Sequence, residues 1–200
     1  MRVLIACEFS GIVRDAFRAR GHDAWSCDLL PTEKPGQHLQ GDVLALLSVT
    51  QWDLMIAHPP CTYLTNAGVR HLHESCTSCN GRRTAVYGQA RFAAMREAAT
   101  FFNALKSANI QRIAIENPTP HKYARELIGN YQQVFQPWEF GEPETKRTCL
   151  WLKGLPPLMA TIIETKRYPR CHMQSPGPDR WKERSRTLQG IADAMASQWG

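Results

Sequence analysis

Long apolar runs are missing from this sequence, and their absence limits where the protein can reside. No stretch approaches the roughly 20 residues that a membrane-spanning helix needs. The opening run VLIAC, after Arg2, is also too short for the h-region of a signal peptide. We therefore expect no membrane association and a cytoplasmic location. The seven cysteines should then be reduced, because disulfides persist mainly in oxidising compartments.

Acidic residues are in deficit, and internal repeats and linkers are absent. The 18 Asp and Glu residues face 24 Lys and Arg residues, which gives a net charge of +6. Such an excess favours a polyanionic partner such as nucleic acid. With 200 residues, 43% of them hydrophobic, the chain is long enough to bury a core. We expect a single domain over residues 1–200.

Short apolar runs alternate with helical patterns along the chain. Strands are predicted at residues 2–7, 22–27, 54–57, 112–116, 134–140 and 148–152, and helices at 12–20, 90–107, 123–128 and 188–199. Residues 31–41, 66–88 and 156–179 are predicted to be loops or irregular segments, and a loop as long as 66–88 is usually functional or disordered. This alternation predicts an α/β fold with a doubly wound, mostly parallel sheet.

The most distinctive stretch is His58-Pro59-Pro60-Cys61, which ends an apolar run. Both prolines fix φ and push the preceding residue toward extended geometry, so the turn is rigid. In open α/β sheets the ligand crevice lies outside the carboxyl ends of the strands. Cys61 is therefore a candidate nucleophile. The alternative is that Cys61 only packs, since free cysteine is among the most buried residue types.

Four predicted strand ends carry a recognisable set of motifs. They are FSG at 9–11, Asp28, PPC at 59–61 and ENP at 116–118. In this order, from Val3 to Trp199, the chain resembles the cytosine carbon-5 DNA methyltransferases, and most of all their short phage-type members. The resemblance implies the Rossmann-like methyltransferase fold and S-adenosylmethionine as the cofactor. Amino-directed methyltransferases carry an aromatic residue where this chain has Cys61.

The resemblance also assigns cofactor-binding residues. They are Phe9, Ser10, Gly11, Asp28, Asp42 and Pro59. Asp28 takes the position that binds the ribose hydroxyls, and Asp42 the position that meets the adenine amino group. The family motif F-x-G-x-G-G is incomplete, because Val13 and Arg14 replace its last two glycines. Either aspartate has the alternative role of capping a turn or helix.

The chemistry of the family explains why Cys61 and Glu116 occur together. Carbon 5 of cytosine is a poor nucleophile until a thiolate adds to carbon 6. A carboxyl group at ring nitrogen 3 stabilises the charge that this addition creates. We expect neighbouring positive charge to lower the pKa of Cys61, with His58 as one candidate. Glu116 alone has the alternative of being an ordinary strand-end carboxylate.

A basic turn, Glu144-Thr145-Lys146-Arg147, resembles the family's Q-x-R-x-R motif. Arg147 takes the position of the last arginine, which precedes a strand, while the glutamine and the first arginine are missing. The resemblance implies that Arg147 is catalytic by orienting the base or Glu116. Lys146 is a candidate for nucleic-acid binding, or a solvated charge. Thr187 is expected to help cap the last helix.

The segment that would recognise DNA is small. Only residues 153–185 are available for it, and they are basic and rich in proline. Arg180 and Lys182 in this segment, with Arg82 and Arg83 in the 66–88 loop, are candidates for contacting nucleic acid. The alternative is an ordinary solvated surface. We expect a target cytosine flipped from the DNA stack, and low or short sequence specificity.

A zinc site is a further candidate. Its ligands would be Cys76, Cys79, Cys171 and His172, with His71 and His73 as rival ligands. The zinc would be structural and would hold the 66–88 loop, which we expect to close over the flipped base.

Two other functions remain open from the sequence. The small recognition segment allows a methyltransferase that acts on free cytosine nucleotides. The missing glycines allow a nucleic-acid-binding protein that keeps only a relict methyltransferase fold. Phage-type relatives suggest a role in marking phage DNA against restriction. The sequence does not predict an oligomeric state.

Overall fold

The computed structural model describes residues 1–73 and 87–200, and within them a seven-stranded sheet forms the centre of the molecule. The strands lie in the order β3-β2-β1-β4-β5-β7-β6. Their bounds are β1 Arg2–Ala6, β2 Asp23–Asp28, β3 His38–Gln40, β4 Leu54–Ala57, β5 Arg112–Pro118, β6 Gln133–Phe135 and β7 Thr148–Lys153. Within the described sheet, the two pairs made by β7, with β5 and with β6, are antiparallel and the other four pairs are parallel. The predicted α/β fold with a doubly wound, mostly parallel sheet is therefore confirmed.

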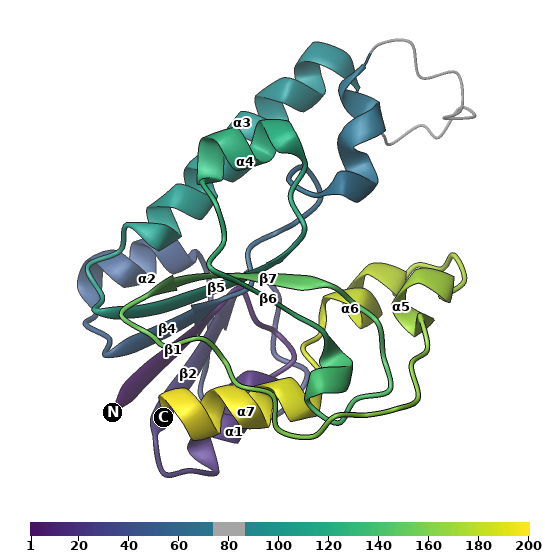
Figure 1. The fold of residues 1–200 in the computed structure, drawn as a ribbon. Helices are drawn as coiled ribbons and strands as arrows, with labels where there is room; N and C mark the ends of the chain where they lie inside the picture. Colours follow the sequence, from purple (N-terminus) through teal and green to yellow (C-terminus); the bar gives the residue numbers. More distant parts are fainter. Residues whose placement is uncertain (74–86) are drawn as a thin grey trace.

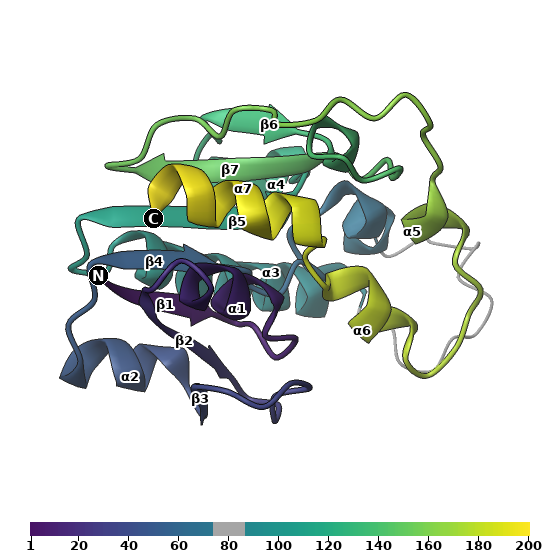
Figure 2. The same cartoon turned by 90° about the horizontal axis from the view of Figure 1, so that it is seen from below.

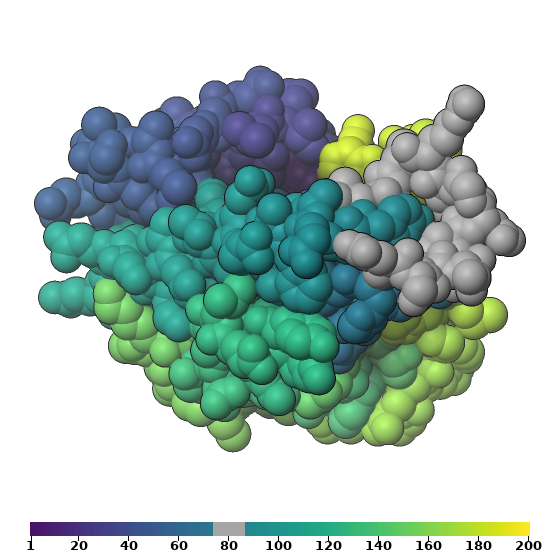
Figure 3. Space-filling view, turned by 90° about the horizontal axis from the view of Figure 1, so that it is seen from above, coloured from purple at the N-terminus to yellow at the C-terminus, as the bar shows by residue number. Residues whose placement is uncertain are grey.

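Helices cover both faces of the sheet (Figure 1). Their bounds are α1 Ile12–Arg18, α2 Val43–Val49, α3 Gly88–Lys106, α4 Lys122–Ile128, α5 Arg170–Met173, α6 Arg180–Ser185 and α7 Gln189–Trp199, with 3-10 helices η1 Asn66–Leu72 and η3 Pro137–Glu139. Helices α2, α3 and α4 lie on one face, where α3 crosses between the other two (Figure 3). Helices α1 and α7 pack together on the opposite face (Figure 2).

The strand β4 shows why the central apolar runs are uninterrupted. All four of its side chains are buried. Because side chains alternate along a strand, Met55 and Ala57 belong to the core under α3, whereas Leu54 and Ile56 belong to the core under α1 and α7. Among the described residues, no helix combines the length and the apolar character needed to cross a bilayer.

Several boundaries differ from the sequence prediction for local reasons. Residues 38–40, predicted as loop, form the edge strand β3, whose polar sequence gives no apolar signal. The strand predicted over 134–140 ends at Phe135, because Pro137 begins η3. The segment predicted as a loop over 66–88 begins with η1. Thr187 does not cap α7, since no side chain accepts from the helix at the cap position, Leu188.

The carboxyl ends of the parallel strands meet at one edge of the sheet. This edge lies on the side of the molecule where α5 and α6 are found (Figure 2). The segment that follows β7 therefore returns across the strand ends before it reaches α7. Residues at the ends of β1, β2, β4 and β5 are brought together there, as parallel pairing requires.

Candidate active site

Cys61 is held at the end of β4 by contacts to two other elements. The Asn117 side chain, from β5, donates to the carbonyl oxygen of Pro59 at 3.1 Å. On the other side of the cysteine, the buried Arg91 guanidinium of α3 donates to the carbonyl oxygen of Thr62 at 2.9 Å. The rigid proline turn predicted from the sequence is thus fixed at both ends, which limits the positions that Cys61 can take.

Glu116 lies on β5, the strand next to β4, and is paired with His58. The pairing of Ala57 with Ile115 places His58 and Glu116 at the next position along the two strands. The Nδ1 atom of His58 lies 3.0 Å from Oε2 of Glu116, and both side chains are largely buried. Burial raises the pKa of Glu116, but the hydrogen bond with His58 and the charge of Lys146 outweigh it and lower this pKa overall.

The surroundings of Cys61, taken together, raise the pKa of its thiol. Burial, followed by the negative charge of Glu116, raises its pKa, and the positive charges of Lys146 and Arg184 offset this only in part. The expectation that neighbouring positive charge would lower the pKa of Cys61 is therefore wrong for this state. His58, the candidate for that role, contacts Glu116 instead.

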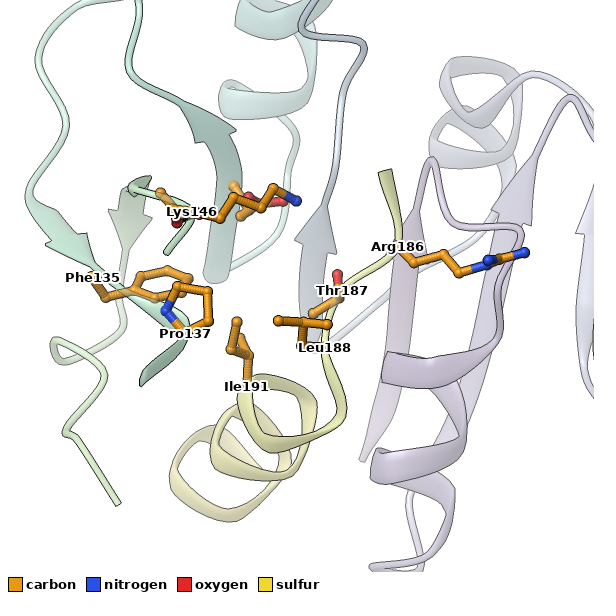
Figure 4. Close-up of a pocket in the computed structure, with 9 residues that line it drawn as sticks. Phe135, Pro137, Lys146, Arg186, Thr187, Leu188 and Ile191 are labelled. Atoms are coloured by element: carbon orange, nitrogen blue, oxygen red, sulfur yellow. Dashed lines mark hydrogen bonds between the residues drawn. The ribbon is translucent and has the colours of Figure 1, made fainter. Parts of the chain in front are cut away.

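The structure brings Lys146, and not Arg147, to Glu116. Lys146 and Glu116 line the same small cavity, across which the lysine side chain extends (Figure 4). Phe135, Leu188 and other apolar side chains form another part of its wall. Arg147 is exposed, and its guanidinium donates to the hydroxyl of Tyr131 at 3.4 Å. In this geometry Lys146 is the nearer cation for a base bound at Glu116.

A second, larger cavity adjoins the first and shares Lys146 with it. Its volume is about 730 Å³. The lining comes from the turn before β7 and from the segment that carries α5 and α6, and consists of Glu144, Lys146, Tyr168, Pro169, Arg170, Cys171, Met173, Gln174, Glu183, Arg184, Arg186 and Leu188. The cavity is large enough for a nucleobase, since small-molecule sites are typically about 300–1,000 Å³.

The segment carrying α5 and α6 is attached to the sheet edge at both ends. Near α5, the buried Glu144 carboxylate accepts from the backbone N–H of Cys171 at 3.2 Å and pairs with Arg170 at 3.3 Å. After α6, Arg186 makes two hydrogen bonds to Glu33, at 2.7 and 2.9 Å. The segment therefore spans from the turn before β7 to the loop after β2. We call residues 168–186 the strap.

The predicted cofactor motif forms a tight turn between β1 and α1. Gly11 adopts φ 74°, which other residues rarely reach, and caps α1. Ser10 is buried and donates to Glu8 Oε1 at 3.1 Å. The Phe9 ring lies 6.1 Å from the ring of Trp181 in the strap. Glu8, which the sequence reasoning missed, also accepts from the backbone N–H of Val13 at 2.8 Å.

Arg14, which replaces a family glycine, is completely buried and organises the neighbouring loop. Its guanidinium donates to Asp15 at 2.8 Å and to the Ser26 and Thr32 hydroxyls. It also donates to two backbone carbonyls of the loop, at Lys34 and Pro35, each at 3.2 Å. A side chain on Gly11 would collide with this guanidinium, since an added Cβ would lie 2.5 Å from Nη2. Arg14 thus fills space that glycines would leave open.

The two candidate aspartates both make local hydrogen bonds. Asp28 accepts from the backbone N–H of Leu30, and Asp42 accepts from that of Leu44 as the N-cap of α2, each at 2.9 Å. Burial raises the pKa of Asp28. The carboxylates of Glu8, Asp28 and Asp42 near adjacent strand ends fit a ligand that has ribose hydroxyls and positive charge, as S-adenosylmethionine has. Their cofactor roles remain predictions.

Of the predicted nucleic-acid contacts, two lie in the described residues besides Lys146. Arg180 and Lys182 are on α6, where Arg180 donates to the carbonyl oxygen of Gln174 at 2.8 Å. Lys182 lies 3.9 Å from Asp179. Arg82 and Arg83 lie outside the residues that the structure describes. DNA contact by these residues remains a prediction.

The predicted zinc site can be followed only in part. Cys76 and Cys79 fall outside the described residues. Cys171 is half-buried and His172 exposed, both on α5. Over residues 1–73 and 87–200 no group of three or more His, Cys, Asp or Glu side chains could hold a metal ion. Zinc binding therefore stays a prediction.

Comparisons with known proteins give a likeness of fold. No family model matches the chain, and no curated protein matches it. A crystal structure described as a DNA modification methyltransferase encoded within an E. coli prophage is 14% identical, with a TM-score of 0.46, over 88% of this chain and 55% of that one. The Entamoeba histolytica methyltransferase EhMeth is 12% identical, with a TM-score of 0.49, over 88% and 60%.

A third solved structure, the Dnmt2 methyltransferase of S. pombe, is 15% identical, with a TM-score of 0.38, over 78% of this chain and 50% of that one. The chain thus spans about half to three-fifths of the length of these proteins. At such low identities the likeness concerns the fold alone.

Proposed function

We propose that this protein is an S-adenosylmethionine-dependent methyltransferase that methylates carbon 5 of cytosine in DNA through a covalent Cys61 adduct. One observation carries the proposal. Cys61 follows β4 and Glu116 lies on β5, the parallel neighbour of β4, so that the Glu116 charge, after burial, raises the pKa of the thiol. A thiol and a carboxyl group side by side at a strand edge suit a reaction in which one attacks a ring and the other stabilises it.

The charges that act on Cys61 suggest an order for the reaction. In the free protein burial, and after it the charge of Glu116, raise the pKa of the thiol. A cytosine whose nitrogen 3 shares a proton with Glu116 would reduce that negative charge. The pKa of Cys61 would then fall, and Lys146 and Arg184 would favour the thiolate. Binding of the base would therefore favour formation of the nucleophile.

Each residue has one task in the chemistry that follows. The Cys61 sulfur adds to carbon 6, and Glu116 stabilises the ring at nitrogen 3. The cofactor supplies an electrophilic methyl group to carbon 5, and Glu8, Asp28 and Asp42 are the residues that would hold it. A base or water removes the carbon-5 proton, and the Cys61 thiolate leaves. Lys146 lies where it can contact the base carbonyl or a phosphate. Arg147 is outside the cavity, beside Tyr131, where it can contact DNA.

The larger cavity, which adjoins the small Glu116 cavity at Lys146, is compatible with a base flipped out of DNA. Its wall carries Tyr168, Arg184 and Lys146, which offer an aromatic face and positive charge. The strap is only 19 residues long, so we expect it to read little DNA sequence. The proposed substrate is therefore a cytosine in a short or loosely defined site.

The test is to trap the covalent adduct. DNA that contains 5-fluorocytosine is incubated with the protein and S-adenosylmethionine, and a denaturant-resistant adduct is sought by mass spectrometry. Fluorine cannot leave carbon 5 as a proton does, so the reaction stops with Cys61 bound to carbon 6. We expect an adduct that maps to Cys61, is absent with Cys61→Ser, and does not accumulate on unmodified DNA.

Other outcomes would point to the other functions. Turnover of deoxycytidylate without an adduct on duplex or single-stranded DNA would select the free nucleotide as substrate. Failure to bind S-adenosylmethionine in calorimetry, together with retained DNA binding, would select the relict nucleic-acid-binding protein.

A further inference from the structure

Two glutamates and a histidine form a row across three adjacent strands, near the carboxyl ends of these strands. Glu8 follows β1, His58 follows β4, and Glu116 lies on β5. The strands are neighbours in the sheet, and the backbone N–H of His58 donates to the carbonyl oxygen of Ala6 at 2.9 Å. The row therefore places one imidazole between two carboxyl groups, beside the site of Cys61.

The His58 ring is held by Glu116 at one nitrogen only. Nδ1 lies 3.0 Å from Glu116 Oε2, and the side chain is 8% exposed. Nε2 is buried and has no hydrogen-bond partner among the residues that the structure describes. Because an ionised carboxylate only accepts hydrogen bonds, the proton of this pair resides on Nδ1. His58 is thus oriented toward Glu116 but is not fixed by a second structural hydrogen bond.

Charged groups from three elements surround His58. Burial raises the pKa of Glu8, and His58 offsets this only in part. For Glu116, the hydrogen bond with His58 and the charge of Lys146, from the turn before β7, outweigh burial and lower the pKa. Among the described residues, His58 makes its side-chain hydrogen bond to Glu116.

We propose that His58 is a positioning residue that acts through Glu116, by holding its carboxyl group through Nδ1 and so orienting it toward nitrogen 3 of the base. This proposal rests on the proposed function. It gives a task to the one titratable side chain of the His58-Pro59-Pro60-Cys61 turn, besides the nucleophile, that the reaction has not used.

The first experiment tests the pairing without requiring any methyl transfer. The pKa of Glu116 is measured by carbon-13 NMR of the glutamate carboxyl groups in the full chain, with Glu116→Gln for assignment. We expect the pKa of Glu116 to rise in His58→Ala, because the hydrogen bond and the charge are both lost. In His58→Asn, whose amide can donate from the place of Nδ1, it should rise less. An unchanged pKa in His58→Ala would overturn the proposal.

The second experiment tests whether this orientation serves the reaction. The rate of adduct formation on 5-fluorocytosine DNA is measured in a single turnover. His58→Ala should be slower by roughly 10²-fold, the lower range for general acid–base catalysis. His58→Asn, whose amide can donate from the place of Nδ1, should recover part of the lost rate. His22→Asn, at the opposite edge of the sheet, is the matched control and should behave as wild type.

The outcomes separate this proposal from the proposed function. If the wild-type protein forms no adduct on any substrate, the proposed function fails while the NMR result still decides the pairing. If wild type forms the adduct and His58→Ala matches its rate, the proposal is overturned. It is equally overturned if His58→Asn recovers none of the rate that His58→Ala loses. Thermal unfolding of each variant verifies that it is folded.

Discussion

At the scale of single residues, the opposing effects of Glu116 and Lys146 on Cys61 can be separated experimentally. Glu116 raises the pKa of the thiol and Lys146 lowers it. Only the thiolate is alkylated, so the alkylation rate at a fixed pH reports this balance. At pH 8, Glu116→Gln should therefore react faster with iodoacetamide than wild type, and Lys146→Met should react more slowly, each by about tenfold for one unit of pKa shift.

The measurement is peptide mapping of the alkylated Cys61 over time by mass spectrometry. Cys149 is completely buried and provides an internal reference, whose labelling should stay slow in all three proteins. Equal rates in the two variants would show that neither charge acts on the thiol.

Arg14 is the second residue whose replacement should have a specific effect, here on the free energy of unfolding. Its guanidinium is fully buried and satisfies a carboxylate, two hydroxyls and two carbonyls. Arg14→Met leaves these groups without their donor, and breaking a buried charged network typically costs about 3 kcal/mol or more. We expect the free energy of unfolding to fall by about that amount in denaturant titrations, as well as faster amide exchange in residues 30–36.

A matched variant lies on the same helix. Arg18 is exposed, and Arg18→Met should change the free energy of unfolding by no more than about 0.5 kcal/mol, as is usual for surface substitutions. If both variants were equally stable, Arg14 would not be the anchor of this loop.

At the scale of elements, the salt bridge between Arg186 and Glu33 fixes the strap to the loop after β2. Both side chains are about 30% exposed, at 28% and 32%, and the arginine engages both carboxylate oxygens. A bidentate pair at this exposure should contribute about 1 kcal/mol, the upper range for surface pairs. A double-mutant cycle with Arg186→Gln and Glu33→Gln measures it.

The pH dependence of this coupling energy follows from the direction in which the pKa of Glu33 is shifted. The hydrogen bond from Arg186 lowers the pKa of Glu33. The stabilisation is therefore fully present above the ordinary pKa of a glutamate and is lost as the pH falls through the lowered value. Lys182 and Asp179 form a control pair, 3.9 Å apart and more exposed, whose coupling should be near zero. A coupling for Arg186 and Glu33 that persists in strong acid would contradict an ionic origin.

Elements were predictable from the sequence where burial decides them. β4 and β5 are apolar because helices cover both their faces, so a short apolar run was a sufficient signal. β3 was missed because an edge strand of three residues, with the sequence HLQ, buries little. The sequence likewise predicted that Cys61 and Glu116 would follow neighbouring strands.

The partners of these two residues were not predictable in the same way. His58 was considered as a neighbour of Cys61, but strand register pairs it with Glu116. Lys146 approaches Glu116 while the adjacent Arg147 does not, because consecutive residues in the extended turn before β7 point in different directions. Such choices depend on register and side-chain direction, which no single motif specifies.

At the scale of the whole molecule, the net charge of +6 has a consequence for the proposed DNA binding. Each lysine or arginine that neutralises a phosphate releases counterions, so affinity falls with salt in proportion to the number of contacts. Besides Lys146, the candidates within the described residues are Arg180 and Lys182 on α6 of the strap. Replacing either with glutamine should reduce the slope of log affinity against log salt concentration by about one.

The measurement is fluorescence anisotropy with a labelled duplex, over a series of salt concentrations. Arg20→Gln removes the same kind of charge after α1, toward the opposite edge of the sheet, and serves as the control. If contact is confined to the strap, Arg20→Gln should leave the slope unchanged, whereas a general attraction by net charge would reduce the affinity equally in all three variants. The comparison therefore decides whether the strap is a binding surface, because total charge is identical in the three variants and only its position differs.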